Sequence, residues 1–409
     1  MRILYAIMSY EAENIGNEVH EELVAHFAER GHTVEVFTLR ASGATHRDEE
    51  SSRLQVANLI PENQKPQPAA LGPKGWVVGK SWDLKLETWN STPVHTLLFA
   101  PANRLRRVLR AFCQWLFHYN YFLELVFGLR RFLHERQGQY DVIHIEAAYP
   151  LGAAIGLALA LAKVKPPLVM NLQGADVMNL PRYDYGYGRY WFVRRLLNYT
   201  FKQATAVRPN SYYTAELAYK LGAKRDRTQV ILRNIGQAIY PPPDLELTSY
   251  KADKAAELRR RYDLNAGPIL MAYSRLHPFK GIEFLVRAIP IIKEKYGPVN
   301  LLVCGPSRNT PRYGDYRRHL EKVAQALGVQ EEIVFTGRID FAQSREYLAA
   351  ADILVVPSVV EALNKVAIEA AAVATPSVIT DSTGIGRHAA KRGWPFWLSL
   401  PVKPPWLPS

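Results

Sequence analysis

Cysteine is scarce in this chain of 409 residues, which contains only Cys113 and Cys304. A disulfide-stabilised scaffold needs several cysteines, and zinc or dithiol redox sites need cysteines separated by only a few residues. The two cysteines are far apart in the sequence and match none of these patterns. We therefore expect a protein of a reducing compartment without a disulfide framework.

Long apolar runs are also missing, since no stretch approaches the ~18–20 consecutive apolar residues of a membrane-spanning helix. The longest candidate, residues 151–164, is too short and is better explained as a buried helix. The N-terminal apolar run of residues 2–8 ends at Ser9 with no cleavage site after it, so a secretion signal is not expected. These absences predict a cytoplasmic protein and leave a peripheral position at the inner face of a membrane open.

Acidic residues are fewer than basic ones, 38 against 51, and the net charge of +13 is unevenly distributed. Residues 101–140 and 181–208 each carry a net charge of +5. Basic segments with interleaved aromatic residues suit an anionic lipid surface, and a solvated helix face is the alternative. No recognition motif accompanies the charge, so nucleic acid is not expected as a partner. The aromatic residues are Trp115, Phe117, Tyr119, Tyr121 and Phe122 in the first segment, and Tyr183, Tyr185, Tyr187, Tyr190 and Trp191 in the second.

Apolar runs alternate with helical patterns, which favours parallel sheets covered on both faces. The alternation restarts after residues 240–243, and 48% hydrophobic residues suffice for two cores. We therefore predict an α/β protein with two Rossmann-like doubly wound domains facing a cleft, where ligands bind beyond the carboxyl ends of the strands. The predicted strands are residues 2–8, 33–39, 142–145, 168–172, 269–273, 301–304, 333–336, 353–356 and 377–380. Residues 104–136 are predicted to form one or two amphipathic helices, and residues 61–93 no regular element.

The C-terminal tail differs in composition from the rest of the chain. Residues 394–409 contain three of the eight tryptophans, five prolines and no acidic residue. Such sequence does not continue a helix or a central strand. We therefore interpret the tail as an out-of-frame or truncated end, after which the second domain remains incomplete with five strands.

Two glutamates follow a predicted strand at the start of a helix. Glu361 lies before the helix and Glu369 about two turns further on. A helix that begins at the carboxyl end of a strand presents free N–H groups and the positive end of its dipole to an anion. Carboxylates beside such a phosphate site can accept hydrogen bonds from sugar hydroxyls. The alternative is a helix with two glutamates that face solvent.

Two cations lie in the loop after the strand at residues 269–273. Arg275 and Lys280 stand where the first strand of the second domain ends. Cations in this position can bind a diphosphate and stabilise the charge on a departing one.

Together these motifs resemble the retaining, metal-independent glycosyltransferases of family 4, the group 1 transferases with two Rossmann-like domains. The resemblance covers residues 1–386, and further matching landmarks are residues 335–337, residues 351–352 and Ser211. It implies that Glu361 lies near the transferred sugar, that Glu369 binds the ribose hydroxyls of the donor, and that Arg275 and Lys280 contact the diphosphate. It also implies that the main-chain N–H groups of Leu363, Asn364 and Lys365 bind the donor and that Gly16 lies near the donor phosphate.

On this resemblance the chain divides into four parts. Residues 1–240 form the N-terminal acceptor-side domain, and residues 241–267 the linker and first helix. Residues 268–386 form the domain that binds the nucleotide sugar, and residues 387–409 the atypical tail.

The acceptor side departs from the family pattern at one position. The family often has a histidine where this chain has Gln173, followed by Gly174 and Asp176. Glutamine cannot act as an acid or base, but it can hydrogen-bond an acceptor or the transferred sugar. Gln173 and Asp176 are therefore predicted to bind the acceptor. His144 and Glu146 end a strand nearby, where they either line an acceptor pocket or have a structural role.

Together with these residues, the resemblance implies a retaining hexosyltransferase that moves a sugar from a nucleotide-diphosphate donor to a saccharide or lipid-linked acceptor, in cell-surface polysaccharide or glycolipid synthesis. The catalytic residues would be Arg275, Lys280 and Glu361. No Asp-x-Asp motif occurs, so no metal is expected. The glycine turn at residues 384–386 lacks the context of a dinucleotide site, so no other cofactor is expected either. A sugar-nucleotide epimerase or phosphorylase of the same fold, and a truncated remnant that binds a nucleotide or membrane without catalysis, are the alternatives.

Overall fold

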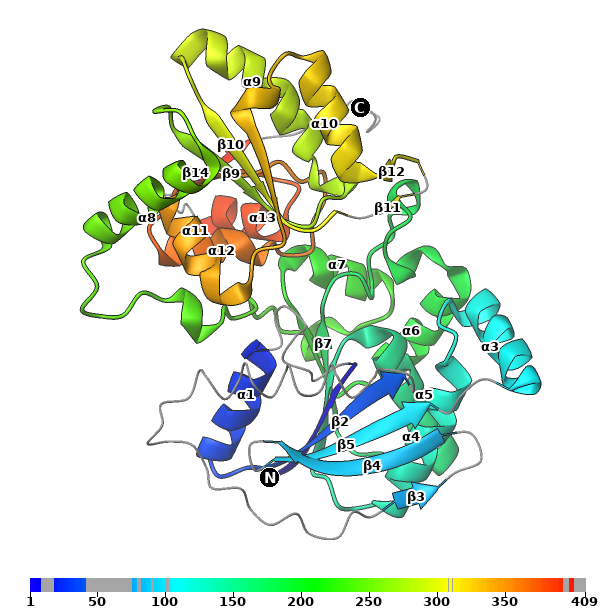
Figure 1. Ribbon diagram of the computed structural model, residues 1–409. Coiled ribbons are helices and arrows are strands. Elements are labelled where there is room, and N and C mark those ends of the chain that lie inside the picture. The colour runs from blue at the N-terminus through cyan, green and yellow to red at the C-terminus, as the bar shows by residue number, and fades with distance from the viewer. Residues whose placement is uncertain are drawn as a thin grey trace. The chain divides into compact units, whose positions relative to one another are not determined.

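The computed structural model describes residues 1–8, 18–41, 76–78, 82–89, 92–99, 103–307, 309–310, 312–392 and 397–400 (Figure 1). The chain divides into an N-terminal unit, Met1–Asn210 with Thr214–Ile231, and a C-terminal unit, Ser211–Tyr213 with Leu232–Ser409. The main division thus falls between residues 231 and 232, whereas the sequence placed it after residue 240. None of the described helices is both long and apolar enough to cross a bilayer.

The N-terminal unit contains a mixed sheet with the strand order β3-β4-β5-β2-β1-β6-β7-β8. From β5 to β8 neighbouring strands are parallel, as predicted, whereas β4 runs antiparallel to both β3 and β5. The antiparallel strands lie partly in residues 61–93, for which the sequence analysis expected no regular element. The strands are β1 (Arg2–Ile7), β2 (Thr33–Ala41), β3 (Trp76–Val78), β4 (Trp82–Trp89), β5 (Thr92–Phe99), β6 (Val142–Glu146), β7 (Leu168–Leu172) and β8 (Ala206–Pro209).

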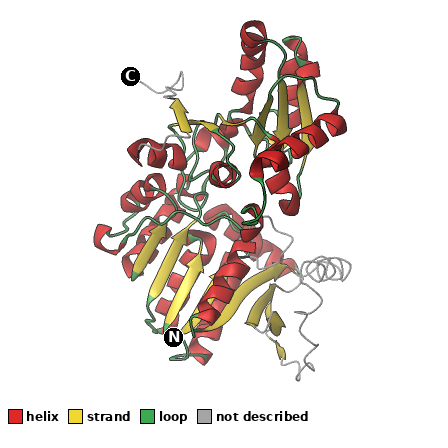
Figure 2. Ribbon diagram, turned by 90° about the vertical axis from the view of Figure 1, so that its left-hand side faces the viewer, coloured by secondary structure: helices red, strands yellow, loops and turns green. Residues whose placement is uncertain are grey.

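Helices cover both faces of this sheet (Figure 2), and strand β1 shows why its sequence is continuously apolar. Leu4 and Ala6 belong to the core that also contains residues of α4 and α5, whereas Ile3 and Tyr5 belong to the core with Val24 of α1. Alternate side chains of one strand point to opposite faces, so a strand covered on both faces needs apolar residues throughout. The helices are α1 (Glu18–Glu29), α3 (Arg104–Phe117), α4 (Phe122–Glu135), α5 (Ala153–Ala162), α6 (Trp191–Gln203) and α7 (Tyr212–Lys220).

The C-terminal unit contains a parallel sheet with the order β13-β10-β9-β14-β15-β16. All five strands predicted for this part of the chain are present. The strands are β9 (Ile269–Tyr273), β10 (Asn300–Cys304), β13 (Ile333–Gly337), β14 (Ile353–Val356), β15 (Ser377–Thr380) and β16 (Trp397–Leu400), with a separate antiparallel pair of β11 (Asn309–Thr310) and β12 (Gly314–Asp315). The helices are α8 (Leu247–Tyr262), α9 (Ile282–Tyr296), α10 (Tyr316–Ala326), α11 (Ser344–Ala350), α12 (Lys365–Ala372) and α13 (Gly384–Arg392).

The prediction that this sheet stops after five strands is wrong. β16, which lies in the tail of unusual composition, pairs in parallel with β15 from Ser377↔Trp397 to Thr380↔Leu400. An edge strand tolerates flanking prolines because only one of its sides needs backbone hydrogen bonds. A tail composition that excludes a central strand therefore still permits this edge strand.

Candidate functional site

The loop after β9, residues 274–281, carries both predicted cations. His277 caps a short 3₁₀ turn, Pro278–Lys280, and the side chain of Lys280 at the end of this turn is buried, with an exposed fraction of 9%. Arg275 is exposed instead, and no ion pair among the described residues involves it. The loop thus holds one cation out of solvent and presents the other.

Close backbone contacts hold this loop against the loop after β14. The Val359 N–H donates to the Phe279 carbonyl at 2.9 Å. Gly281 has a φ of +68°, and a Cβ at this position would lie 2.0 Å from the Pro357 carbonyl oxygen. Only glycine allows this approach without displacement of one backbone. The two loops that carry the predicted donor site are therefore fixed to each other.

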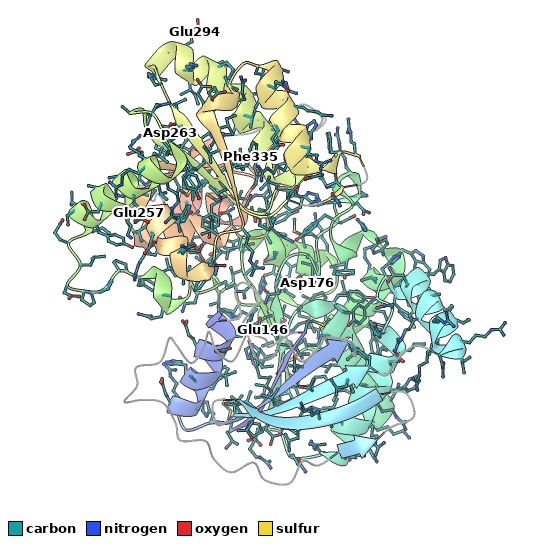
Figure 3. All side chains as sticks on the ribbon, in the orientation of Figure 1. Glu146, Asp176, Glu257, Asp263, Glu294 and Phe335 are labelled. Atoms are coloured by element: carbon teal, nitrogen blue, oxygen red, sulfur yellow. The ribbon has the colours of Figure 1, made fainter. Side chains whose placement is uncertain are left out.

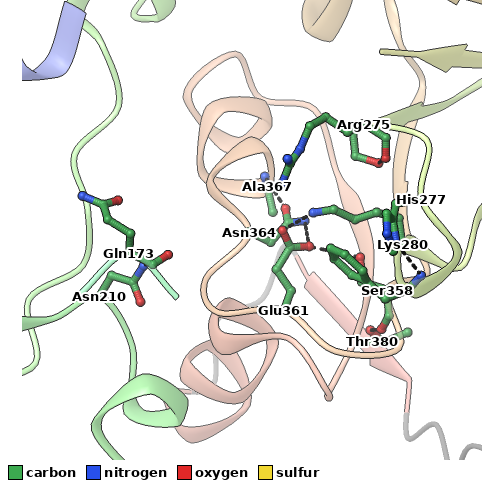
Figure 4. A network of polar contacts seen from close by, with 12 residues as sticks. Gln173, Asn210, Arg275, His277, Lys280, Ser358, Glu361, Asn364, Ala367 and Thr380 are labelled. Atoms are coloured by element: carbon green, nitrogen blue, oxygen red, sulfur yellow. Dashed lines mark hydrogen bonds and ion pairs between the residues drawn. The ribbon is translucent and has the colours of Figure 1, made fainter. Parts of the chain in front are cut away.

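The carboxylate of Glu361 is the centre of a polar network between these loops (Figure 4). Lys280 Nζ forms an ion pair with Glu361 Oε1. The other oxygen, Oε2, accepts hydrogen bonds from Asn364 Nδ2 at 2.8 Å and Ser358 Oγ at 3.1 Å. Lys280 and Glu361, which are 81 positions apart in the sequence, are thus brought into direct contact. Figure 4 shows the Arg275 side chain beside this network.

Opposing effects act on the pKa of Glu361. Burial raises it, whereas the positive charge of Lys280 and the hydrogen bonds from Lys280, Asn364 and Ser358 lower it. The lowering effects are larger together, and the pKa lies below its ordinary value of 4.5. Glu361 is therefore ionised at neutral pH and neutralises the ammonium group of Lys280.

The start of α12 lies directly after Glu361. Asn364 adopts a left-handed conformation, φ 72°, and its side-chain oxygen accepts the Ala367 N–H at 3.2 Å as an N-terminal cap. Within the loops and turns that the structure describes, the N–H groups of Leu363, Asn364 and Lys365 donate no hydrogen bond to a backbone carbonyl. Unpaired N–H groups at a helix start can bind an anion. The three main-chain N–H groups that were predicted to bind the donor are thus free to do so.

Glu369 does not face solvent freely, because its side chain is buried and forms an ion pair with Lys365 at 2.9 Å. The two glutamates of the motif therefore each neutralise a different lysine of the C-terminal unit, Lys280 and Lys365. The alternative interpretation of two solvent-facing glutamates is wrong.

In the N-terminal unit, Asp176, labelled in Figure 3, forms hydrogen bonds to the backbone of two loops. Its carboxylate accepts backbone N–H groups of Gly174 at 2.7 Å, Ala148 at 2.8 Å and Gln173 at 3.3 Å. Its side chain is buried, and burial raises its pKa against the lowering effect of these hydrogen bonds. The carboxylate thus ties the loops after β6 and β7 together.

Gln173 is oriented by a buried carboxylate. Its side-chain Nε2 donates to Glu146 Oε2 at 2.6 Å, and its main-chain carbonyl oxygen accepts from Asn210 Nδ2 at 3.3 Å. Glu146 Oε1 accepts from the amide of Asn171, which also lies 2.7 Å from His144 Nε2. Glu146 and His144 therefore belong to the polar cluster that holds the predicted acceptor residue.

The structure adds one set of residues that the sequence analysis did not assign. The hydroxyls of Thr380 and Ser382 both donate to the Ser358 carbonyl, at 2.6 and 2.7 Å, and fix the loop whose side chains bind Glu361. The available signal was a pair of short hydroxyl residues at the end of the strand predicted for residues 377–380 and two positions beyond it. Gly16, predicted to lie near the donor phosphate, falls outside the described residues.

Family models match both parts of the chain. The model described as glycosyl transferase 4-like domain matches residues 16–233, and the model described as glycosyl transferases group 1 matches residues 267–397. The chain belongs to the family 4, group 1 glycosyltransferases. The resemblance stated from the motifs is confirmed.

Curated relatives of this glycosyltransferase align over parts of their length. A GDP-mannose-dependent alpha-(1-6)-phosphatidylinositol monomannoside mannosyltransferase of Mycobacterium tuberculosis is 32% identical over 36% of this chain and 38% of its own length. A putative teichuronic acid biosynthesis glycosyltransferase of Bacillus subtilis is 27% identical over 61% of this chain and 56% of its own. The chain thus spans about two fifths to just over half of these relatives.

Solved structures share the fold over nearly the whole chain. HepE from Anabaena, in complex with UDP and glucose, has 17% sequence identity and a TM-score of 0.64, covering 98% of this chain and 86% of that one. A sucrose-phosphate synthase from Thermosynechococcus elongatus has 18% identity and the same TM-score and coverage. The predicted architecture of two Rossmann-like domains is confirmed.

Proposed function

We propose that this glycosyltransferase is a retaining, metal-independent hexosyltransferase that uses a nucleotide-diphosphate sugar. The observation that carries the proposal is the convergence of Arg275, Lys280 and the free N–H groups at the start of α12 around Glu361. Such an arrangement provides positive charge and N–H donors for a diphosphate without a metal ion.

In the proposed reaction, the bond between the anomeric carbon and the diphosphate oxygen breaks while the acceptor oxygen bonds to the same face of that carbon. The nucleoside diphosphate leaves with the bonding electrons, and the acceptor proton passes to its released oxygen. Arg275 and Lys280 stabilise the charge that develops there. Glu361 holds Lys280 in place and, with Glu369, orients the donor.

The names of the relatives support the substrate classes. One relative is named for GDP-mannose and a phosphatidylinositol acceptor, another for teichuronic acid biosynthesis, and HepE was solved with UDP and glucose. We infer a saccharide or lipid-linked acceptor of a cell-surface polymer or glycolipid, which the N-terminal unit binds around Gln173.

Thermal unfolding with UDP, GDP and ADP tests the donor site. A nucleotide at ~100 times its Kd stabilises the folded state by roughly 2.7 kcal/mol, so one of the three is expected to raise the Tm. Arg275→Ala should abolish that shift while the Tm without nucleotide stays unchanged. Arg260→Ala, at an exposed position of α8, is the matched control and should retain the shift. No shift with any nucleotide would contradict the proposal.

Product analysis tests the reaction class. With the sugar nucleotide that matches the stabilising nucleotide, the anomeric configuration of the product, determined by NMR, should equal that of the donor. Activity should survive EDTA. An inverted product, or a reaction that requires inorganic phosphate or changes the sugar without an acceptor, would contradict the proposal.

A further inference from the structure

Helix α3 of the N-terminal unit exposes a line of large apolar side chains. Leu105, Val108, Phe112 and Trp115 are 77%, 64%, 46% and 71% exposed. Their spacing of three, four and three residues places them on one face of the helix. An exposed helix face in a water-soluble unit is normally polar, so this apolar stripe requires an explanation.

The opposite face of α3 already attaches the helix to the unit. Cys113 and Phe117 are buried, and Leu109 packs against the same core. On this side, Arg110 forms an ion pair with the buried Glu124 of α4, with Nε 2.9 Å from Oε2. The exposed stripe is therefore not needed to hold the helix in place.

Positive charge flanks the stripe. Arg104 and Arg107 are exposed, and none of the ion pairs of the described residues includes them. The sequence of α3 contains four arginines and no acidic residue. The surface thus combines apolar side chains with uncompensated positive charge.

The start of α6, which contacts α3 (Figure 1), also exposes aromatic and basic side chains. Phe192 packs edge-on against Phe117 of α3, with ring centroids 5.4 Å apart. The adjacent Trp191 is 63% exposed, and Arg195 is exposed as well. Two neighbouring helices therefore present tryptophan and arginine side chains from the same part of the unit.

We propose that the stripe of Leu105, Val108, Phe112 and Trp115, with the arginines beside it, binds the surface of an anionic lipid bilayer. Apolar side chains enter the boundary between headgroups and acyl chains, tryptophan favours that boundary, and arginines attract anionic headgroups. This inference goes beyond the proposed transfer reaction and does not depend on it.

Charge distinguishes a bilayer from a second copy of this chain. Two α3 helices packed face to face would bring their arginines together, and neither helix has a carboxylate to neutralise them. An anionic bilayer supplies the opposite charge over its whole surface. The structure therefore favours lipid over self-association.

Vesicle flotation of the full chain tests the proposal. Binding to vesicles that contain phosphatidylglycerol should exceed binding to phosphatidylcholine vesicles by at least about tenfold and should fall as salt is added. Phe112→Ser/Trp115→Ser and Arg104→Gln/Arg107→Gln should each lower the partition coefficient about tenfold or more. All four positions are partly or fully exposed, so both variants should keep the Tm of the parent protein.

Matched controls come from the C-terminal unit. Ile291→Ser/Tyr296→Ser removes two apolar side chains that are 67% and 72% exposed, and Arg260→Gln/Lys322→Gln removes two exposed charges. Both controls should bind vesicles like the parent protein.

Three results would overturn the inference. They are no preference for anionic vesicles, α3 variants that bind as well as the controls, or a dimer in sedimentation analysis that Phe112→Ser/Trp115→Ser dissociates. The nucleotide-induced Tm shift of the α3 variants reports separately on the proposed donor site, and we expect it to be unchanged.

Discussion

The carboxylate of Glu361 neutralises Lys280, whose side chain is almost completely buried. The side chains of Lys280 and Glu361 are 9% and 16% exposed. Glu361→Gln leaves the ammonium group without its counter-charge, so we expect the C-terminal unit to lose about 2 kcal/mol of stability, less than for a fully buried pair. Urea unfolding measures this. Glu321→Gln, which breaks the exposed Arg317–Glu321 pair, should cost at most about 1 kcal/mol.

The lowered pKa of Glu361 also predicts how the stability lost in Glu361→Gln depends on pH. The pKa of Glu361 is lower in the folded protein than its ordinary value of 4.5, so its stabilising contribution is fully present above that value. The contribution is lost as the pH falls through the lowered pKa. The stability difference between the parent protein and Glu361→Gln should therefore shrink below about pH 4.5. A difference that stays constant down to pH 3 would contradict the ion pair.

Asp176 allows a second prediction for a single residue. Its carboxylate accepts three backbone N–H groups, from Ala148, Gln173 and Gly174. Asp176→Asn replaces one acceptor oxygen with an NH₂ group that would face a donor, so we expect a loss of about 1–3 kcal/mol. Urea unfolding of this variant and of Asp184→Asn, whose carboxylate is largely exposed, compares the two sites. Equal stabilities of the two variants would contradict the loop-fixing role.

The sequence identified the loops of the site better than the partners of each side chain. Gln173 and Asp176 were both predicted to bind the acceptor, but only the structure shows that Asp176 holds backbone N–H groups and that Glu146 orients the Gln173 amide. Likewise, a motif places Glu361 near a helix start but does not predict its contact with Lys280. Contacts between residues far apart in sequence depend on the register of strands and the path of loops, which local patterns do not determine.

At the scale of elements, the contact between the loops after β9 and β14 depends on one glycine. Gly281 and Gly328 have nearly the same φ, +68° and +67°, but a Cβ at Gly281 would lie 2.0 Å from the Pro357 oxygen, whereas a Cβ at Gly328 meets nothing within 4 Å. Gly328→Ala should therefore cost only the strain of the left-handed conformation, about 1 kcal/mol.

Gly281→Ala should cost more and should also weaken the nucleotide-induced Tm shift, because the loops that carry Lys280 and Glu361 must separate. Thermal unfolding of both variants, with and without the stabilising nucleotide, measures the two effects. If Gly281→Ala matched Gly328→Ala in both, the close approach would have no role in the site.

Strands were predictable from the sequence where both of their faces are buried. The parallel strands of both sheets are short apolar runs, which are typical of strands covered on both faces. β4 was missed although residues 82–89 alternate in polarity, because they were interpreted together with residues 61–81, which are rich in proline and glycine and show little periodicity. β16 was missed because prolines lie on both sides of it, at positions 395, 401, 404 and 405, and proline is rare within central strands.

At the scale of the molecule, each unit has hydrophobic clusters of its own. Among the described residues, Leu4 and Tyr5 of β1 belong to two different clusters of the N-terminal unit, and Met271 and Leu270 of β9 to two different clusters of the C-terminal unit. A region with its own core can unfold separately, with its own free energy of unfolding. A ligand that binds residues of one unit therefore stabilises that unit directly.

Hydrogen exchange with and without the stabilising nucleotide tests where it binds. The residues that the proposal places at the donor, Arg275, Lys280, Glu361 and Glu369, belong to the C-terminal unit. At ~100 times its Kd, the nucleotide should slow exchange of the most protected amides of this unit by up to about a hundredfold. The most protected amides of β1 and β6 should exchange at unchanged rates, and Arg275→Ala should remove the effect. A bound ligand slows the exchange of an amide only if the ligand must dissociate before the unit that contains this amide unfolds. Slowing confined to the N-terminal unit would therefore place the nucleotide at Gln173 rather than at Glu361.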